Sequence, residues 1–333
     1  MSESPRPIAF PKEFASDANA AMDHLFAAFP DHYPRLVSEE EHEWHFRLDW
    51  PSDPLWYVDP HIVEAARSMY GCSLQELLQF EDFRPCARAT FLFSMFHSRA
   101  LLVPARAAEC NKVTNFTNII HVDDHDDLVR PLLSARNGSL FDPFAGLLVD
   151  IDDEASVRGA IERGVISKGS FLTAYVLAKP AGSIVHVKTN SPRRESWLQK
   201  RDSTITLAGK PYPISFTEYF EARIPNSWHI AERPDLPLRL SNTDAVWLDV
   251  DLDAFCNRYD GDSDRRDIAA TAAEQQEMQT QIQRFLAALQ QAEWKSQVKA
   301  ISLAASPSFF PSDYWSYAVQ KVADGLHETL CGT

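Results

Sequence analysis

The chain has 333 residues, of which 45% are hydrophobic, and this is enough for one large domain or two smaller ones. Its formal net charge of −15 argues against a surface for nucleic-acid phosphates, which requires clustered Lys and Arg. The first residues lack the apolar segment of a signal peptide, and no apolar run is long enough to span a membrane. We therefore expect a cytoplasmic protein that binds neither nucleic acid nor membranes.

The chain contains five cysteines, and no two of them are spaced as in a C-x-x-C motif. An odd number of cysteines without such a motif predicts free thiols in a reducing compartment. This expectation covers all five: Cys72, Cys86, Cys110, Cys256 and Cys331.

Residues 1–88 are rich in proline, aromatic and acidic residues, and they show no strong strand pattern and no repeat. Helical patterns are expected near residues 16–29, 61–69 and 72–80. We therefore expect residues 1–88 to form a mainly helical extension, followed by a separate domain that comprises residues 89–333.

From residue 89 onward, apolar runs that are typical of strands alternate with helical patterns. Strands are expected within 89–103 and at 116–122, 144–152, 182–189, 244–255 and 297–310. Helices are expected at 154–165 and 268–294, while 170–178 fits either structure. The basic stretch 190–214 is expected to be an exposed insertion or loop. This alternation predicts an α/β fold with a mostly parallel sheet that helices cover on both faces.

Two clusters of acidic residues each follow a strand-like run. In "NIIHVDDHDDL" and "VWLDVDLDAF" the alternating residues are Asp123, His125 and Asp127, and Asp249, Asp251 and Asp253. Alternate residues of an extended chain share one face, so the members of each triplet would project together. Ligands of parallel sheets gather at the carboxyl ends of the strands, where both clusters lie.

Carboxylates that lie this close together repel one another unless they are protonated, paired with a base or bound to a cation. Neither cluster contains a Lys or an Arg, although Arg130 is close in sequence. A divalent metal explains both clusters, and oxygen ligands with some imidazole suit Mn²⁺. The alternative is an exposed acidic turn that binds nothing.

These two motifs together resemble the metal-binding motifs of the ureohydrolases, the arginase and agmatinase group of the arginase/deacetylase fold. The resemblance covers about residues 89–310, and it includes an upstream histidine, for which His97 in "MFHSRALL" is in the right place. The sequences "IIHVDDHDDL" and "WLDVDLDAF" are most similar to a divergent branch that includes peptide arginases. These enzymes convert arginine side chains of ribosomally made precursor peptides to ornithine. The resemblance implies a three-layer α/β/α arginase-like fold.

The resemblance also implies a site with two manganese ions. One ion would be held by His97, Asp123, Asp127 and Asp249, and the other by His125, Asp123, Asp249 and Asp251. A hydroxide shared by the two ions would attack the guanidinium carbon and give urea and ornithine. The implied partner is an arginine-containing precursor peptide, and the oligomeric state stays open, a homo-oligomer included.

Two features of arginases that act on free arginine are absent. No histidine closely follows the first motif as a proton shuttle, so His186 is a candidate for that role, although a histidine within a strand is more often structural. The stretch "SLAASPSFF" carries no Glu to bind the guanidinium, which favours a larger substrate such as a peptide. His121 and Asp253 are candidates for supporting the metal ligands, and Ser170 is a candidate hydrogen-bond donor in the pocket.

Three other functions remain open from the sequence. The first is a ureohydrolase of a small molecule, such as free arginine, agmatine or a guanidino acid. The second is a deacetylase-like hydrolase with a single zinc ion, which would not need both Asp249 and Asp251. The third is a metal-stabilised binding protein without turnover.

Overall fold

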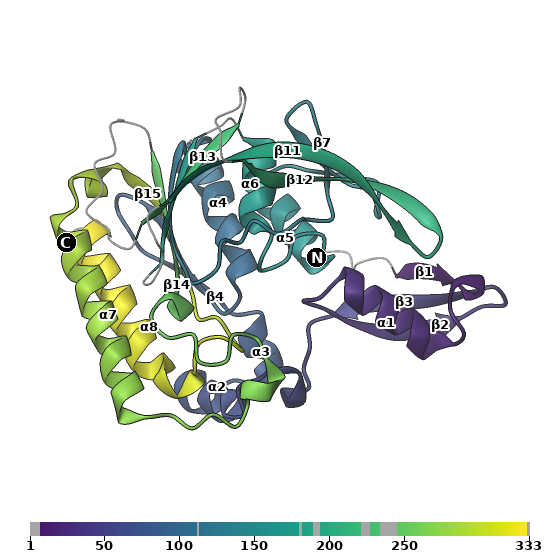
Figure 1. Ribbon diagram of the computed structural model, residues 1–333, viewed down its shortest axis with the longest axis horizontal. Helices are drawn as coiled ribbons and strands as arrows, with labels where there is room; N and C mark the ends of the chain where they lie inside the picture. Colours follow the sequence, from purple (N-terminus) through teal and green to yellow (C-terminus); the bar gives the residue numbers. More distant parts are fainter. Residues whose placement is uncertain are drawn as a thin grey trace.

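The computed structural model describes residues 7–111, 113–179, 182–188, 194–220, 227–233 and 245–331. Its centre is a nine-stranded sheet with the strand order β12-β11-β13-β10-β6-β14-β15-β5-β4 (Figure 1). In chain order these strands are β4 (Glu81–Arg84), β5 (Thr90–Ser94), β6 (Asn118–Val122), β10 (Ser183–Val187), β11 (Arg194–Leu207), β12 (Lys210–Phe220), β13 (Trp228–Arg233), β14 (Val246–Asp251) and β15 (Val298–Ala304).

The class is α/β, but the expectation of a mostly parallel sheet is wrong, because the sheet is mixed. The neighbours β13, β10, β6, β14, β15 and β5 run parallel. On one side β11 and β12 form an antiparallel hairpin, and on the other side β4 pairs antiparallel with β5. Much of the stretch 190–214, expected to be a loop, therefore belongs to the sheet.

Helices lie on both sides of the central strands (Figure 1). They are α1 (Ala18–Ala28), α2 (Ile62–Tyr70), α3 (Leu74–Leu78), α4 (Leu102–Asn111), α5 (Glu154–Glu162), α6 (Phe171–Ala178), α7 (Ala272–Gln291) and α8 (Trp315–Leu326). Figure 1 shows α4, α5 and α6 on one side, and α7 and α8 on the other. The ambiguous stretch 170–178 is thus helical. In the part of the chain that the structure describes, no helix has both the length and the apolar character needed to cross a membrane.

The N-terminal region is not mainly helical. Its three predicted helices are present as α1, α2 and α3, but β1 (Ile8–Pro11), β2 (Tyr33–Glu39) and β3 (Glu43–Asp49) also form an antiparallel sheet. This small sheet and α1 form a lobe that protrudes at the right of Figure 1. In β3 the side chains of Trp44, Phe46 and Leu48 are buried and alternate with partly exposed residues, which is the pattern of a half-buried strand.

Smaller elements complete the fold. A third sheet contains β7 (Ser134–Arg136), β8 (Ser139–Asp142) and β9 (Leu147–Val149), all antiparallel. Cys86 and Cys331 are joined by a disulfide bond, whereas Cys72, Cys110 and Cys256 are free. The expectation of five free thiols is therefore wrong for two of them. The sequence gives no spacing signal for this bond, because the two cysteines are 245 residues apart.

Candidate metal centre

The two acidic motifs meet at the ends of neighbouring strands. Strands β6 and β14 are parallel neighbours, and their register pairs Asp249 with His121 and Val250 with Val122. Asp123 directly follows β6, and Asp251 is the last residue of β14. Because parallel strands end at the same edge of a sheet, the two motifs lie side by side although more than 100 residues separate them.

His97 lies where these strand ends meet. It follows β5 by three residues and begins a short 3₁₀ helix, His97–Leu101. Its Nδ1 atom is 3.0 Å from Asp123 Oδ2, 2.8 Å from Asp127 Oδ2 and 3.0 Å from Asp251 Oδ2. All four side chains are buried. A single imidazole nitrogen carries at most one proton, so it cannot satisfy three carboxylates.

Two of these carboxylate oxygens have no hydrogen bond. In the described part of the chain, neither Asp123 Oδ2 nor Asp127 Oδ2 has a hydrogen-bond partner, although both are buried. An unsatisfied buried carboxylate oxygen is costly, and a cation at the point where these atoms converge would remove that cost. His97, Asp123 and Asp127 therefore form one group that could hold a metal ion.

A second group of ligands shares Asp123 with the first. His125 Nδ1 is 3.0 Å from Asp253 Oδ2 and 3.5 Å from Asp123 Oδ1, and these three residues could also hold an ion. The backbone N–H of His125 donates to Asp123 Oδ1 at 2.6 Å, and Ser306 Oγ donates to Asp253 Oδ2 at 3.4 Å. Two adjacent candidate ion sites with a common carboxylate therefore lie at this edge of the sheet.

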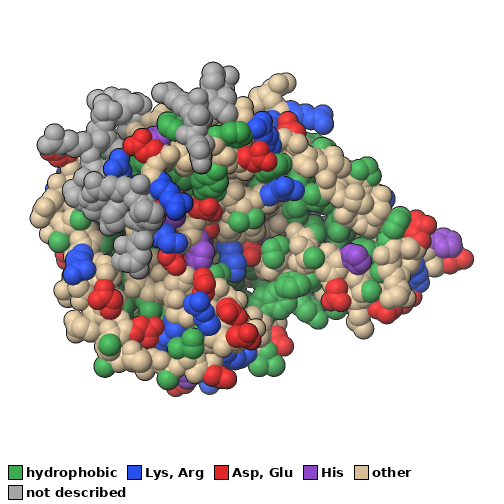
Figure 2. Space-filling model, in the orientation of Figure 1, with side chains coloured by type: hydrophobic (Ala, Val, Ile, Leu, Met, Phe, Trp, Pro, Cys, Tyr) green, Lys and Arg blue, Asp and Glu red, His purple; other side chains and the backbone are tan. Residues whose placement is uncertain are grey.

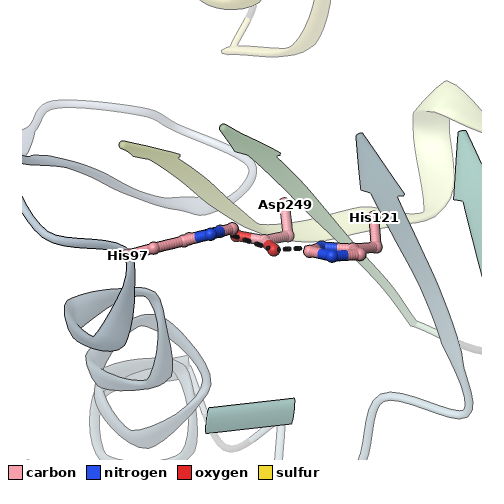
Figure 3. Close-up of side chains that lie close together, drawn as sticks. All are labelled: His97, His121 and Asp249. Carbon is pink, nitrogen blue, oxygen red and sulfur yellow. Dashed lines mark hydrogen bonds and ion pairs between the residues drawn. The ribbon is translucent and has the colours of Figure 1, made fainter. Parts of the chain in front are cut away.

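A third group, His97, His121 and Asp249, lies deeper and is held together by its own hydrogen bonds (Figure 3). Asp249 Oδ2 accepts from His97 Nε2 at 3.0 Å and from His121 Nδ1 at 2.8 Å. Its Oδ1 accepts from Ser302 Oγ at 2.5 Å. The carboxylate is thus fully satisfied without an ion. With Nε2–H donating to Asp249, the Nδ1 atom of His97 lies beside the carboxylates of the first group, where it could bind an ion.

This deeper layer is built by strand register. His186 on β10, His121 on β6, Asp249 on β14 and Ser302 on β15 are consecutive partners across four adjacent strands. The indole N–H of Trp247 donates to Ser302 Oγ at 2.8 Å, so the hydroxyl is oriented in turn. This row of polar side chains lies beneath the candidate metal ligands, within an otherwise apolar core.

The electrostatics of the site favour the binding of a cation. Burial, together with the charge of Asp123, raises the pKa of Asp127 to about 7. Burial raises the pKa of Asp253 well above its usual range, and the charges of Asp123 and Asp251 add to this. Hydrogen bonds that His125 donates to the carboxylates of Asp123 and Asp253 raise the pKa of His125 to about 11. Without an ion the cluster would hold protons, which a divalent cation would displace.

A cavity of about 720 Å³ opens above the strand ends. Its lining includes Asp123, His125, Asp127, Asp251 and Asp253, whereas Asp249 is not among the described lining residues. Figure 2 shows acidic, basic and histidine side chains mixed at the centre of this face, and hydrophobic side chains at the junction with the N-terminal lobe. Asp249 belongs to the deeper group that could hold a metal ion, so its role as a bridging ligand stays a prediction, and Asp253 is a further candidate ligand at the cavity.

The remaining candidates have distinct surroundings. His186 reaches the cavity, but its Nε2–H donates to the backbone oxygen of Asp123 at 2.9 Å, and burial lowers its pKa to about 4. His121 lies fully buried below the ligands. Ser170 is also fully buried, and its Oγ accepts from the N–H of Ser167 at 2.8 Å. This serine lines an adjoining groove and stabilises a turn, while Lys168 lines the metal cavity.

Sequence reasoning missed the contribution of the N-terminal region to the site. Pro30 and Asp31, which follow α1, line the metal cavity, and Phe309 closes it near His125 with the two rings 5.0 Å apart. No sequence signal marks Asp31, because a single acid after a helix is common. Neither a family model nor a curated protein matches the sequence. Function must therefore be inferred from the geometry of this site.

Proposed function

We propose that the protein is a dimanganese hydrolase that converts arginine side chains of peptides to ornithine and releases urea. One observation carries the proposal: His97 Nδ1 and the carboxylates of Asp123, Asp127 and Asp251 converge within 3.0 Å. The group shares Asp123 with a second set of ligands, and both sets lie at the floor of a cavity. This arrangement supports a pair of ions that act together on one substrate.

The proposed ligands follow from these distances. His97, Asp123, Asp127 and Asp251 would hold one ion, and Asp123, His125, Asp251 and Asp253 the other. Carboxylate oxygens with one imidazole in each set match the preference of Mn²⁺, whereas thiolate ligands, which zinc often takes, are absent from both sets. Asp123 and Asp251 would contribute to both sets, since Asp123 directly follows β6 and Asp251 is the last residue of the neighbouring strand β14.

Two such ions, when bound, lower the pKa of a shared water and polarise the group that it attacks. The residues of the chain fix the geometry that this chemistry needs. Asp249 holds the His97 ring through Nε2, and His186 fixes the backbone of Asp123. A guanidinium is a poor electrophile, so such preorganisation of the site is essential. The role of His186 as a proton shuttle remains a prediction, and only its Nδ1 is available for it.

The size of the site favours a peptide over free arginine. The metal cavity adjoins a groove of about 440 Å³, because Pro30, Val129 and Ser167 line both. The groove runs past α1 and the end of β11, and many of its lining residues are apolar. A single amino acid would leave it empty, whereas residues that flank an arginine would occupy it.

The test is to incubate the Mn²⁺-loaded protein with arginine-containing peptides, free arginine and agmatine, and to measure urea and peptide mass together. We expect urea from the peptides, with loss of the elements of cyanamide from each modified arginine. Urea from free arginine or agmatine alone would instead support a small-molecule ureohydrolase. Bound metal without urea from any substrate would support a different amide substrate or a binding protein.

A matched pair of variants links activity to the metal. Asp127→Asn should abolish urea release, because it removes a ligand, and Asn is well tolerated at the positive φ of 50° found there. Asp126→Asn is the control, because Asp126 is engaged by Tyr219 Oη at 2.8 Å and by the N–H of Leu128 at 3.1 Å. Equal loss in both variants would point to disruption of the loop and would remove the support for Asp127 as a ligand.

A further inference from the structure

One wall of the metal cavity comes from the N-terminal region and carries an acid. Asp31 follows α1 and lines the cavity together with the candidate ligands from the strand ends. It is only 9% exposed, so it is nine-tenths buried although it lies outside both acidic motifs. A buried carboxylate at the wall of a cavity needs a positive partner or several hydrogen bonds.

The protein provides little of that compensation. The backbone N–H of Lys168 donates to Asp31 Oδ2 at 2.6 Å. Among the residues that the structure describes, no basic side chain forms an ion pair with Asp31, and no hydrogen bond reaches its Oδ1. Two of the basic residues that line the cavity are engaged elsewhere: Lys168 Nζ lies over the ring of Phe309 at 4.7 Å, and Lys188 Nζ is 3.2 Å from Asp124 Oδ1.

The other acids of the cavity that are not proposed ligands have partners. Asp124 Oδ2 accepts from Asn257 Nδ2 at 2.8 Å in addition to its ion pair with Lys188. Asp126 accepts from Tyr219, and Glu232 also has an interaction partner. Among the acids of this cavity that are not proposed ligands, Asp31 is therefore the one whose charge is least compensated by the described part of the chain.

We propose that Asp31 is the anchor for the guanidinium of the substrate, an inference that rests on the proposed function. A guanidinium presents N–H groups in a planar fork that a carboxylate accepts well. With Oδ2 fixed by Lys168 N–H, Oδ1 faces the substrate as a positioned acceptor. This supplies the acid that is missing from "SLAASPSFF", and it gives the N-terminal region a part in substrate recognition.

The experiment compares a cationic and a neutral probe of nearly the same shape. Binding of N-acetylarginine amide and of N-acetylcitrulline amide to the Mn²⁺-loaded protein would be measured by calorimetry. Asp31→Asn should weaken binding of the arginine probe by about 10- to 100-fold and change binding of the citrulline probe by less than about twofold. Asp23→Asn, the same change at an exposed position of α1, should leave both affinities unchanged.

Further measurements exclude a merely structural role. Asp31→Glu keeps the charge and should keep the preference for the arginine probe, and both Asp31 variants should retain the metal content of the wild type. If Asp31→Asn binds the arginine probe as tightly as the wild type does, or loses both probes equally, the anchor is wrong. Urea release with an unchanged KM in Asp31→Asn would overturn the anchor but keep the proposed function. If binding prefers the arginine probe in a way that depends on Asp31, but no substrate yields urea, the anchor is supported and the proposed hydrolase activity is refuted.

Discussion

Replacement of Asp249 by Asn tests whether this carboxylate supports the metal ligands or binds an ion itself. Asp249 accepts hydrogen bonds from His97 Nε2, His121 Nδ1 and Ser302 Oγ, and it does not line the cavity. The amide would keep one acceptor oxygen but direct an NH₂ group at donors. Each lost hydrogen bond to a charged group costs about 1.5–3 kcal/mol. We expect a loss of stability on the order of 3 kcal/mol.

Asp249→Asn should lower the affinity for Mn²⁺ without abolishing binding. A group that orients a metal-bound histidine typically contributes about 10- to 100-fold to metal affinity, equivalent to ~1.4–2.8 kcal/mol. At saturating Mn²⁺, Asp249→Asn should therefore still bind two ions. Asp253→Asn, which removes a proposed ligand from the cavity floor, should bind only one. The measurements are metal content after dialysis against Mn²⁺ and affinity by titration calorimetry.

Ser302→Ala provides a control for the deeper layer. It removes the 2.5 Å hydrogen bond to Asp249 Oδ1 and leaves the bond from His97 in place. It should cost about 1 kcal/mol of stability and have a smaller effect on metal affinity than Asp249→Asn has. If Asp249→Asn binds one ion at saturation while Asp253→Asn binds two, Asp249 is a bridging ligand and the assignment from the cavity geometry fails.

Three further predictions address the protonation, packing and covalent links of the fold. In the metal-free protein, burial opposes protonation of His121, but Asp123 and Asp249 raise its pKa to about 9, and the pKa of Asp127 is about 7. The folded state then binds more protons than the unfolded state between pH 6 and 9. The free energy of unfolding should therefore fall as the pH rises through this range. A free energy that rises with pH, measured by denaturant unfolding, would contradict this prediction. Gly182→Ala should destabilise the protein by about 1–3 kcal/mol, because the new Cβ would collide with the backbone oxygen of Thr117. Gly159→Ala on α5 is its control and should be neutral or stabilising in thermal unfolding, because only the flexible Arg163 side chain must move. Thiol titration of the denatured protein should give three thiols before reduction and five after it, and five thiols in both states would exclude the Cys86–Cys331 bond.

The sequence predicts much of the site because several candidate ligands lie close together in the chain at regular spacing. Asp123, His125 and Asp127 alternate after a strand, and the structure places all three at the cavity. The second motif is ambiguous, because Asp249, Asp251 and Asp253 also alternate and their spacing does not show which of them reach the cavity. Strand β14 ends at Asp251 and a 3₁₀ turn, Leu252–Ala254, follows, so the end of the strand decides which aspartates reach the cavity. Residue spacing does not give that end point.

The errors in the fold have different causes. The basic residues within 190–214 led to the expectation of a loop, but Ala208 and Gly209 form a two-residue turn with positive φ values of 50° and 70° between β11 and β12. Two positive φ values are typical of a hairpin turn, but Ala-Gly lacks the Asn or Asp that usually marks such a turn in a sequence. The ladder between β4 and β5 and the position of Asp31 at the cavity depend on tertiary packing, which no local pattern encodes.

Backbone strain is concentrated around the proposed metal centre, and this leads to a final prediction. Ser306 has a φ of 51° and lines the cavity, and Asp127, Ser308 and Asp260 nearby also have positive φ values. A non-glycine residue in this conformation costs about 1–2 kcal/mol, which the greater freedom of glycine in the unfolded chain partly offsets. Ser306→Gly should therefore raise the free energy of unfolding of the metal-free protein by up to about 1 kcal/mol.

The same change should lower metal affinity severalfold, because Ser306 Oγ donates to Asp253 Oδ2. Asn137→Gly is the matched control, since Asn137 has a φ of 52° in the turn between β7 and β8. It should give a similar gain in stability without any change in metal affinity. The strained backbone at Ser306 would then be tolerated because it positions the Ser306 hydroxyl, which the metal centre needs. If both variants gain stability and neither loses affinity, the strained backbone at Ser306 has no part in metal binding.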